Sequence, residues 1–148
     1  MSLYRFQWAA LPLLLMIPLL AVFGVFGERW ITADAQSGAL ELTVRYPSAF
    51  RYKLLDAIDI TVRNRGTATI DTLTLALDTA YASRFSAVAA VPPFTGSFEV
   101  QIVDLAAGES RRARIEIQAE RYWSHSGQLV AATRSDTARV LLTTMVYP

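Results

Sequence analysis

Two hydrophobicity patterns divide the chain. From residue 6 to residue 27 no position is charged, and the run WAALPLLLMIPLLAVFGVF (8–26) is almost continuously apolar. From residue 39 onward apolar and polar residues alternate instead, which is the period-two pattern of strands with one buried face. The sequence therefore predicts a tail and transmembrane helix over 1–27, a juxtamembrane linker over 28–38 and an extracytoplasmic β-domain over 39–148.

The alternating part predicts seven strands, with an eighth if residues 85–91 are extended and with a short helical turn near 79–84. Strands at this spacing, without a long helical pattern between them, are typical of an antiparallel two-sheet sandwich. The turn at 134–136 is the best candidate for a hairpin. The predicted strands are ALELTVRY (39–46), AIDITVRN (57–64), TIDTLTLALD (69–78), SFEVQIVDL (97–105), RRARIEIQA (111–119), GQLVAAT (127–133) and TARVLLTTMVY (137–147).

Two of these stretches resemble a known family. ITVRNRGTATIDTLTL (60–75), followed by VDLAAGESRRARIEI (103–117), resembles the bacterial immunoglobulin-like modules of the cell-adhesion-related (CARDB-like) type. The resemblance implies an all-β, immunoglobulin-like sandwich of seven to eight strands and, by analogy, adhesion, scaffolding or accessory roles. It covers about residues 38–120 and rests on turn and core positions: Asn64, Gly66, Leu105, Gly108, Glu109 and Ser110.

The opening apolar run has the length of a membrane span. Its 19 residues from Trp8 to Phe26 would form a helix of about 28 Å, close to the roughly 30 Å hydrocarbon core of a bilayer. Trp8 and Trp30 bracket the run, where indole rings favour the headgroup level. Pro12 and Pro18 are tolerated in membrane helices because local adjustments satisfy the freed carbonyls.

A cleaved signal peptide is the alternative to a retained anchor. Signal peptides have an apolar stretch of about 7–15 residues followed closely by a small-x-small cleavage site. This stretch is longer, and the Ala-x-Ala site at 33–35 lies beyond Glu28, Arg29 and Trp30. We therefore expect the segment to be retained as a single-pass anchor.

Charge and residue size suggest how the anchor is oriented and what it contacts. The amino terminus and Arg5 precede the run and Glu28 follows it, so the positive-inside rule favours a cytoplasmic N-terminus. The β-domain would then lie in the periplasm of a bacterium, on the outer side of its inner (cytoplasmic) membrane. Ala21, Gly24 and Gly27 would let another membrane helix approach closely.

Composition excludes several classes of chemistry. Fourteen basic and 13 acidic residues nearly cancel, which disfavours a nucleic-acid partner. With no cysteine and one histidine, disulfides, thiolate sites and ordinary zinc or blue-copper sites are excluded. His125 lies between Ser124 and Ser126, but sequence neighbours seldom form a catalytic pair, and no Gly-x-Ser-x-Gly elbow is present. We expect no enzyme activity, no cofactor and no small-molecule substrate.

Charged side chains give two weaker candidates. Asp56 and Asp59 could share a calcium ion, although an outward aspartate on a strand is usually only solvated. Arg111, Arg112 and Arg114 could contact anionic headgroups or an acidic partner, but a solvated strand face is the simpler interpretation.

Apolar and aromatic residues give the candidate partner contacts. The stretch 80–98 carries a single charge, Arg84, and most of it is expected to pack as a crossover between sheets. Pro92, Pro93 and Phe94 would form an exposed apolar knob, because two prolines cannot donate to a sheet. Tyr122 and Trp123 are a second aromatic candidate, with a buried core tryptophan as the alternative.

These observations favour a non-enzymatic, membrane-anchored accessory subunit. Its sandwich would brace or cap a larger inner-membrane complex, with membrane lipid and other integral-membrane subunits as partners. The alternative is a tethered module that binds or senses an envelope polysaccharide or peptide. Sugar-binding sites usually gather several exposed aromatic rings on one face, so Phe94, Tyr122 and Trp123 would have to converge.

Overall fold

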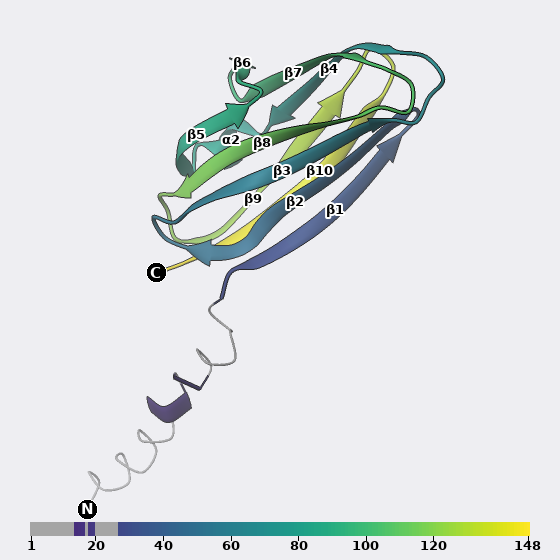
Figure 1. Cartoon of the computed structure of the whole chain (residues 1–148). Coiled ribbons are helices and arrows are strands. Elements are labelled where there is room, and N and C mark those ends of the chain that lie inside the picture. The colour runs from purple at the N-terminus through teal and green to yellow at the C-terminus, as the bar shows by residue number, and fades with distance from the viewer. Residues whose placement is uncertain (1–13, 17, 20–26) are drawn as a thin grey trace, which may run out of the picture.

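The computed structural model describes residues 14–16, 18–19 and 27–148 (Figure 1). Residues 14–16 and 18–19 are helical. The rest is a β-domain with the short helix α2 (Thr79–Ala82). Its strands are β1 (Arg29–Ser37), β2 (Leu40–Arg51), β3 (Leu55–Asn64), β4 (Ile70–Leu77), β5 (Phe85–Val91), β6 (Phe94–Gly96), β7 (Glu99–Leu105), β8 (Ser110–Ala119), β9 (Trp123–Ala132) and β10 (Thr137–Tyr147).

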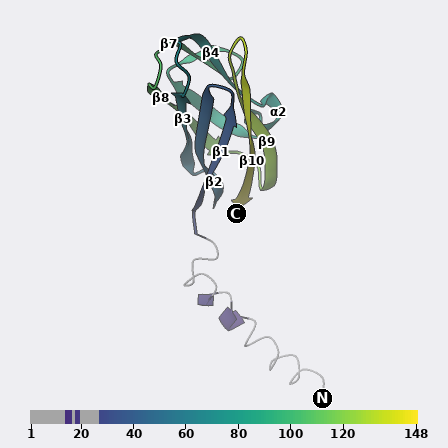
Figure 2. The same ribbon diagram turned by 90° about the vertical axis from the view of Figure 1, so that its right-hand side faces the viewer.

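The strands hydrogen-bond into one continuous sheet in the order β5-β8-β3-β2-β10-β9-β4-β7-β6, with β1 paired to β2. The sheet curls until its two halves face each other, so that β3 and β8 lie across from β4 and β9 (Figures 1 and 2). Inward-facing side chains from both halves form a single buried cluster. This is the arrangement of a β-sandwich, and the prediction of an all-β domain is confirmed.

Strand β2 joins the two halves by changing its partner. Its first part, Leu40–Arg45, pairs antiparallel with β3, whereas Ala49–Arg51 pair parallel with β10. Pro47 lies between these parts and has no N–H to donate to a ladder. Its carbonyl instead accepts a hydrogen bond from Thr144 Oγ1 at 3.0 Å. The proline therefore lies at the point where the strand passes from one half of the sheet to the other.

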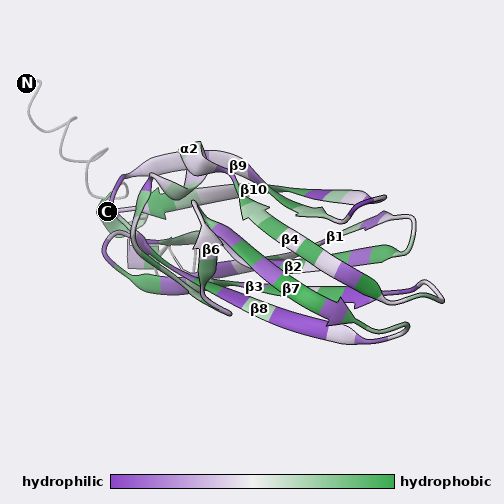
Figure 3. Cartoon of the chain, turned by 90° about the horizontal axis from the view of Figure 1, so that it is seen from above, coloured by the Kyte–Doolittle hydropathy of each residue, from purple (hydrophilic) through white to green (hydrophobic). Residues whose placement is uncertain are grey.

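The buried face follows the alternation in the sequence, because successive strand residues point to opposite sides of the sheet. The inward positions of β2, β3 and β8 are almost inaccessible to solvent, as are those of β4 and β9. Alternating bands of hydrophobic and hydrophilic residues are visible along several strands in Figure 3. The alternation within the predicted strands puts Leu40, Leu42, Val44, Ile58, Ile60, Val62, Leu73, Leu75, Ile115 and Ile117 on the apolar face of their strands, and all are buried.

The crossover between the two halves contains the predicted helical turn. Asp78 caps α2, with its Oδ1 accepting from the backbone N–H groups of Ala80 and Tyr81 at 2.7 and 3.1 Å. Such a cap satisfies donors that have no partner within a helix. The chain then forms β5 at one edge of the sheet and returns through a cis Val91–Pro92 bond to β6 at the other.

Three sequence predictions differ from the structure. Among residues 27–148 the structure has ten strands instead of the expected seven to eight, because the expectation did not include β1 or the short β6. The expected linker over 28–38 is instead largely β1, which pairs along β2 from Arg29 to Ser37. The expected antiparallel sandwich also contains the parallel β2–β10 pair.

The predicted membrane helix lies mostly outside the described residues. Four of its candidate residues are among those not described: Trp8, Pro12, Ala21 and Gly24. Pro18 belongs to the helical residues 18–19, and Gly27 is at a bend. Within residues 14–16, 18–19 and 27–148, no helical stretch has the length and hydrophobicity needed to span a bilayer.

Candidate functional site

One end of the sandwich holds the point where the N-terminal segment joins the domain. Arg29, the first residue of β1, lies beside Ala49 near the end of β2. The C-terminal strand finishes at the same end, where Tyr147 pairs with Arg51. Two perpendicular views place the C-terminus and the start of β1 together (Figures 1 and 2). Any side chain at this end therefore lies close to where the chain enters the domain.

Exposed aromatic and aliphatic side chains gather at this end. The turn after β2 carries Tyr52, whose ring lies 4.5 Å from the ring of Tyr122 in the turn before β9. Trp123, the next residue, is 74% exposed, and Leu55 at the start of β3 is 55% exposed. Three exposed side chains, Leu55, Tyr122 and Trp123, thus lie with the half-buried Tyr52 at one end of the domain. We call Tyr52, Leu55, Tyr122 and Trp123 the aromatic end.

The turns are fixed to each other by backbone hydrogen bonds. The Tyr52 N–H donates to the Tyr147 carbonyl at 2.8 Å, and the Lys53 N–H donates to the Ala119 carbonyl at 3.0 Å. Gln118 Nε2 donates to the Lys53 carbonyl at 2.8 Å. Because three strand ends are joined in this way, the aromatic end is a fixed surface rather than a set of separate loops.

Trp123 also has an unfavourable backbone conformation. Its φ is 79°, and that of Lys53 in the facing turn is 63°. For a residue with a side chain this left-handed region costs about 1–2 kcal/mol, and glycine is the usual solution. A bulky tryptophan that is strained and also mostly exposed contributes little to folding. Such residues are concentrated at functional sites.

Basic and acidic groups surround the aromatic end. The Lys53 ammonium lies 2.8 and 2.9 Å from the two carboxylate oxygens of Glu120 and 5.4 Å from the Tyr52 ring centroid. The hydrogen bond to Glu120 raises the pKa of Lys53, and the bonds from Lys53 and Ser86 lower the pKa of Glu120. The exposed guanidinium groups of Arg51 and Arg121 form no ion pair within the described part of the chain.

An incompletely bonded carboxylate lies next to this end. Asp56 Oδ1 accepts from the Ala57 N–H at 2.8 Å, whereas its buried Oδ2 has no partner among the described residues. Burial raises the pKa of Asp56, and the charge of Glu28 adds to that rise. Glu28 immediately precedes β1, so the point where the chain enters the domain lies near the start of β3.

The two predicted aromatic candidates have different positions in the structure. Tyr122 and Trp123 are exposed, so the alternative of a buried core tryptophan is wrong. Phe94 is half-buried in β6, where its ring packs edge-on to Phe98 at 5.9 Å. The expected knob at 92–94 is therefore reduced to the exposed Pro93 beside a half-buried Pro92. Phe94 packs with Phe98 and Tyr122 with Tyr52, so the rings do not converge into a sugar-binding platform.

Trp30 and the charged candidates have ordinary structural partners. Trp30 lies in β1, with the Arg45 guanidinium 4.8 Å from its ring centroid. Asp59 pairs with Arg114 at 3.3 Å, and Arg111 pairs with Glu109. Arg112 is exposed on the same strand. No cluster of three or more potential metal ligands occurs among the described residues.

His125 has the geometry of a structural residue. Its Nε2 lies 3.0 Å from the Arg121 carbonyl, and its ring packs edge-on to Phe85 at 6.0 Å. Ser126 Oγ contacts Thr143 Oγ1 at 3.4 Å instead of the imidazole. A shallow cavity of about 310 Å³ lies beside His125, Ser124 and Arg84. Neither adjacent serine is held by the imidazole as a nucleophile would be.

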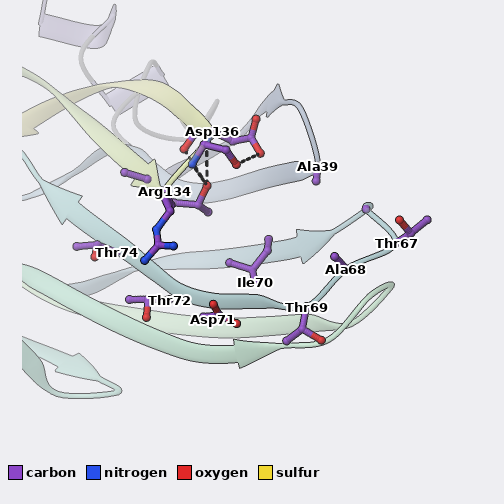
Figure 4. Close-up of a pocket in the computed structure, with 14 residues that line it drawn as sticks. Ala39, Thr67, Ala68, Thr69, Ile70, Asp71, Thr72, Thr74, Arg134 and Asp136 are labelled. Carbon is purple, nitrogen blue, oxygen red and sulfur yellow. Dashed lines mark hydrogen bonds between the residues drawn. The ribbon is translucent and has the colours of Figure 1, made fainter.

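The opposite end of the sandwich contains an open cavity of about 640 Å³ (Figure 4). It is lined by polar and apolar residues of the turn between β3 and β4, of the first part of β4 and of the hairpin between β9 and β10. In that hairpin the Thr133 N–H donates to the Asp136 carbonyl at 2.8 Å, which confirms the predicted turn. Figure 4 shows Arg134 reaching into the cavity toward Thr74.

The residues that carry the family resemblance meet beside this cavity. Asn64 is fully buried, and its Nδ2 donates to the carbonyls of Ala68 and Leu105 at 2.7 and 3.0 Å. Its Oδ1 accepts from Gly66 N–H at 2.9 Å, and its carbonyl accepts from Gly108 N–H at 2.8 Å. The motif therefore holds two turns together and has a structural role.

The two broad outer faces differ in charge. The outer positions of β2, β3 and β8 carry Glu41, Arg45, Asp59, Arg63, Arg112 and Arg114. The outer positions of β10, β9, β4 and β7 pair Leu141 with Gln128, Thr143 with Ser126, Arg139 with Val130 and Thr72 with Val103. Leu141 is 76% exposed and Val103 is 50% exposed. Arg139, exposed on β10 two residues before Leu141, is the one charge among these paired positions. We call the uncharged positions Val103, Ser126, Gln128, Val130, Leu141 and Thr143 the neutral face.

Comparisons with known proteins assign no family. No family model matches the chain, and no curated protein is similar to it in sequence. Among solved structures, PapD-like domain 7 of human CEP192 is similar at 10% identity and a TM-score of 0.40, over 75% of this chain and 87% of that one. The GAE domain of GGA2p from Saccharomyces cerevisiae is similar at 15% identity and a TM-score of 0.38, over 81% of this chain and 98% of that one.

A third similarity is to part of a larger enzyme. A β-glucosidase from Listeria innocua matches at 12% identity and a TM-score of 0.38, over 82% of this chain but only 16% of its own length. At these low TM-scores none of the similarities assigns a function to the chain.

The sequence predicted only half of the aromatic end. Tyr122 and Trp123 were candidates because they are adjacent aromatics in a polar stretch, but Tyr52 and Leu55 were not. These two residues are 70 and 67 positions away in the sequence, respectively, from Tyr122. A detectable signal was the stretch FRYKLL (50–55), in which apolar, aromatic and basic residues interrupt the alternation between two strands.

Proposed function

We propose that this protein is a membrane-anchored, non-enzymatic accessory subunit whose β-sandwich braces or caps a larger inner-membrane complex. The uncharged run over 6–27 anchors it, with the N-terminus in the cytoplasm and the sandwich in the periplasm. The finer assignment to the CARDB-like immunoglobulin-like modules belongs to the same proposal, and it rests on the Asn64 and Gly108 turns.

The observation that carries the proposal is the position of the exposed aromatic residues. They lie at the end of the domain where the chain arrives from the apolar run. Tyrosine and tryptophan favour the membrane interface, and arginine and lysine favour anionic lipid headgroups. A domain anchored at this end stands with its long axis away from the membrane, which leaves its outer faces accessible to a partner.

The neutral face is the best candidate for contact with another subunit. Protein interfaces are depleted of charge at their centre, and Leu141 projects from this face opposite the uncharged Gln128, with the exposed Arg139 two residues away on the same strand. The opposite outer face carries alternating charges on neighbouring strands and is expected to stay in water.

Co-purification tests the proposal. An amino-terminally tagged chain is extracted from membranes of its native bacterial host in mild detergent, and the complexes are separated by size. We expect the wild-type chain in a complex with an integral-membrane protein, and we expect Leu141→Glu to release the chain from it. Arg112→Glu, on the charged face, is the matched control and should leave the complex intact.

Membrane attachment is measured in the same preparation. The chain should resist extraction by alkaline carbonate, and the sandwich should become accessible to protease only after the outer membrane is opened. Recovery of the wild-type chain alone as a monodisperse monomer would contradict the accessory role. Release by carbonate would contradict the anchor.

A further inference from the structure

We infer that the aromatic end is itself a lipid-binding surface, which seats the sandwich on the bilayer interface instead of leaving it tethered above the membrane. This inference rests on the proposed anchor, because only an attached domain is held at the membrane by its entry end. The occupant is the headgroup region of a phospholipid bilayer, preferably an anionic one.

The chain leaves little room for the domain to stand off from the membrane. The apolar run ends at Phe26, and β1 begins at Arg29. The three Cα–Cα steps from Phe26 to Arg29 extend to at most about 11 Å. The end that carries Tyr52 and Trp123 is therefore held within a side chain's length or two of the headgroups. The expected linker over 28–38, which would have allowed a long reach, is instead paired to β2.

The side chains at this end suit an interface rather than a protein core. Tyr122 and Trp123 have amphipathic rings, and Leu55 adds an aliphatic group beside them. Arg51 and Arg121, which form no ion pair with any described residue, directly precede Tyr52 and Tyr122 in the sequence. Each basic residue close to an anionic membrane surface contributes about 1 kcal/mol of attraction. Aromatic groups with flanking arginines are the combination that an anionic headgroup layer binds.

The backbone of Trp123 supports a role outside folding. At a φ of 79° glycine would be the less strained residue. A tryptophan at that position gains little burial within the domain, since most of its ring is exposed. Insertion of the ring into the interface gives the strained residue a contact that the isolated domain does not provide.

Single-cysteine labelling tests the inference on the full chain, which contains no native cysteine. The Trp123→Cys and Leu55→Cys variants carry a fluorophore at the aromatic end. Thr67→Cys carries it in the turn at the opposite end and is the matched control. Each variant is reconstituted into phosphatidylcholine vesicles, with and without phosphatidylglycerol, and quenching by lipids brominated near the headgroup is measured.

We expect labels at positions 123 and 55 to lose most of their emission to brominated lipid, and the label at 67 to lose almost none. Phosphatidylglycerol should deepen the quenching, and an Arg51→Gln, Arg121→Gln double variant should abolish that difference. The chain could stay in the vesicles while labels at 123 and 55 are quenched only by a water-soluble quencher. This result would overturn the inference of a lipid-binding surface but not the proposed anchor.

Two other outcomes are informative. Labels at 123 and 55 that are shielded from both water and lipid would show a protein contact in place of lipid, which overturns the inference. A chain that does not remain with the vesicles contradicts the proposed anchor itself.

As an independent measurement, Trp123→Gly should unfold at equal or higher denaturant concentration than wild type while placing the label at 55 further from lipid. A clear loss of folding stability would instead assign Trp123 a structural role.

Discussion

The hydroxyl groups of Tyr81 and Thr144 form a buried pair, 2.8 Å apart, between helix α2 and the last strand. Thr144 Oγ1 also donates to the Pro47 carbonyl at 3.0 Å. A threonine hydroxyl has one hydrogen, so Tyr81 is the donor to Thr144. This chain of two hydrogen bonds joins α2 and β10 to the strand that changes its partner.

Tyr81 makes the domain sensitive to alkaline pH. Burial raises the pKa of Tyr81 from its ordinary value of 10.0 to about 12. The folded state therefore holds this proton more tightly than the unfolded state does. The resulting stability is fully present below about pH 10 and is lost as pH rises toward 12. We expect the free energy of unfolding in urea to fall by about 2 kcal/mol across that window.

Tyr81→Phe is the control for this pH effect. It should cost about 1 kcal/mol at neutral pH through the lost hydrogen bond, and it should flatten the decline above pH 10. An unchanged alkaline decline in Tyr81→Phe would assign the effect to other groups.

Replacing Asn64 by leucine should strongly destabilise the domain. The change removes both donors to the Ala68 and Leu105 carbonyls and the acceptor for the Gly66 N–H. Buried polar groups left without partners cost about 1–3 kcal/mol each, so we expect a total loss of about 3 kcal/mol or more. Chemical denaturation followed by circular dichroism measures it. Arg63→Ala, at the exposed preceding position, should change stability by less than about 0.5 kcal/mol.

Two glycine substitutions separate the cost of a steric clash with an added Cβ from the cost of a positive φ. A Cβ at Gly127 would lie 2.3 Å from Tyr81 Cβ, so Gly127→Ala must displace α2 or β9. A Cβ at Gly108 would have no neighbour within 4 Å, and only its φ of +76° opposes a side chain. We expect losses of about 3 kcal/mol for Gly127→Ala and about 1 kcal/mol for Gly108→Ala. Equal losses, measured by thermal unfolding, would contradict this assignment.

Asp56→Asn should stabilise the domain at neutral pH. The amide keeps the oxygen that accepts from Ala57 and removes a charge that burial opposes. Because the pKa of Asp56 is raised in the folded state, wild type is most stable with this group protonated and loses that stability as pH rises through the folded pKa. The gain in Asp56→Asn, about 0.5 kcal/mol for a partly exposed group, should therefore disappear in acid. Denaturation at about pH 7 and about pH 3 measures the difference; a gain that persists in acid would contradict the pKa explanation.

The sequence by itself determined most of the strands and their buried faces. Leu40, Ile60, Leu75 and Ile115 were assigned to the core correctly, because the two-residue period of a strand is a local property of the backbone. The Asn64 turn was also evident, because asparagine and glycine mark turns locally. The uncharged run over 6–27 is likewise visible in the sequence alone.

Only the tertiary structure decided which turns lie together. The pairing of β1 with β2 converts an expected linker into an edge strand. The 4.5 Å contact between Tyr52 and Tyr122 depends on the β2–β10 pairing and on the bonds between Lys53, Gln118 and Ala119. Contacts between residues this far apart in sequence depend on how the whole sheet curls, and no local pattern encodes that. The aromatic end is therefore a property of the fold, although each of its residues is visible in the sequence.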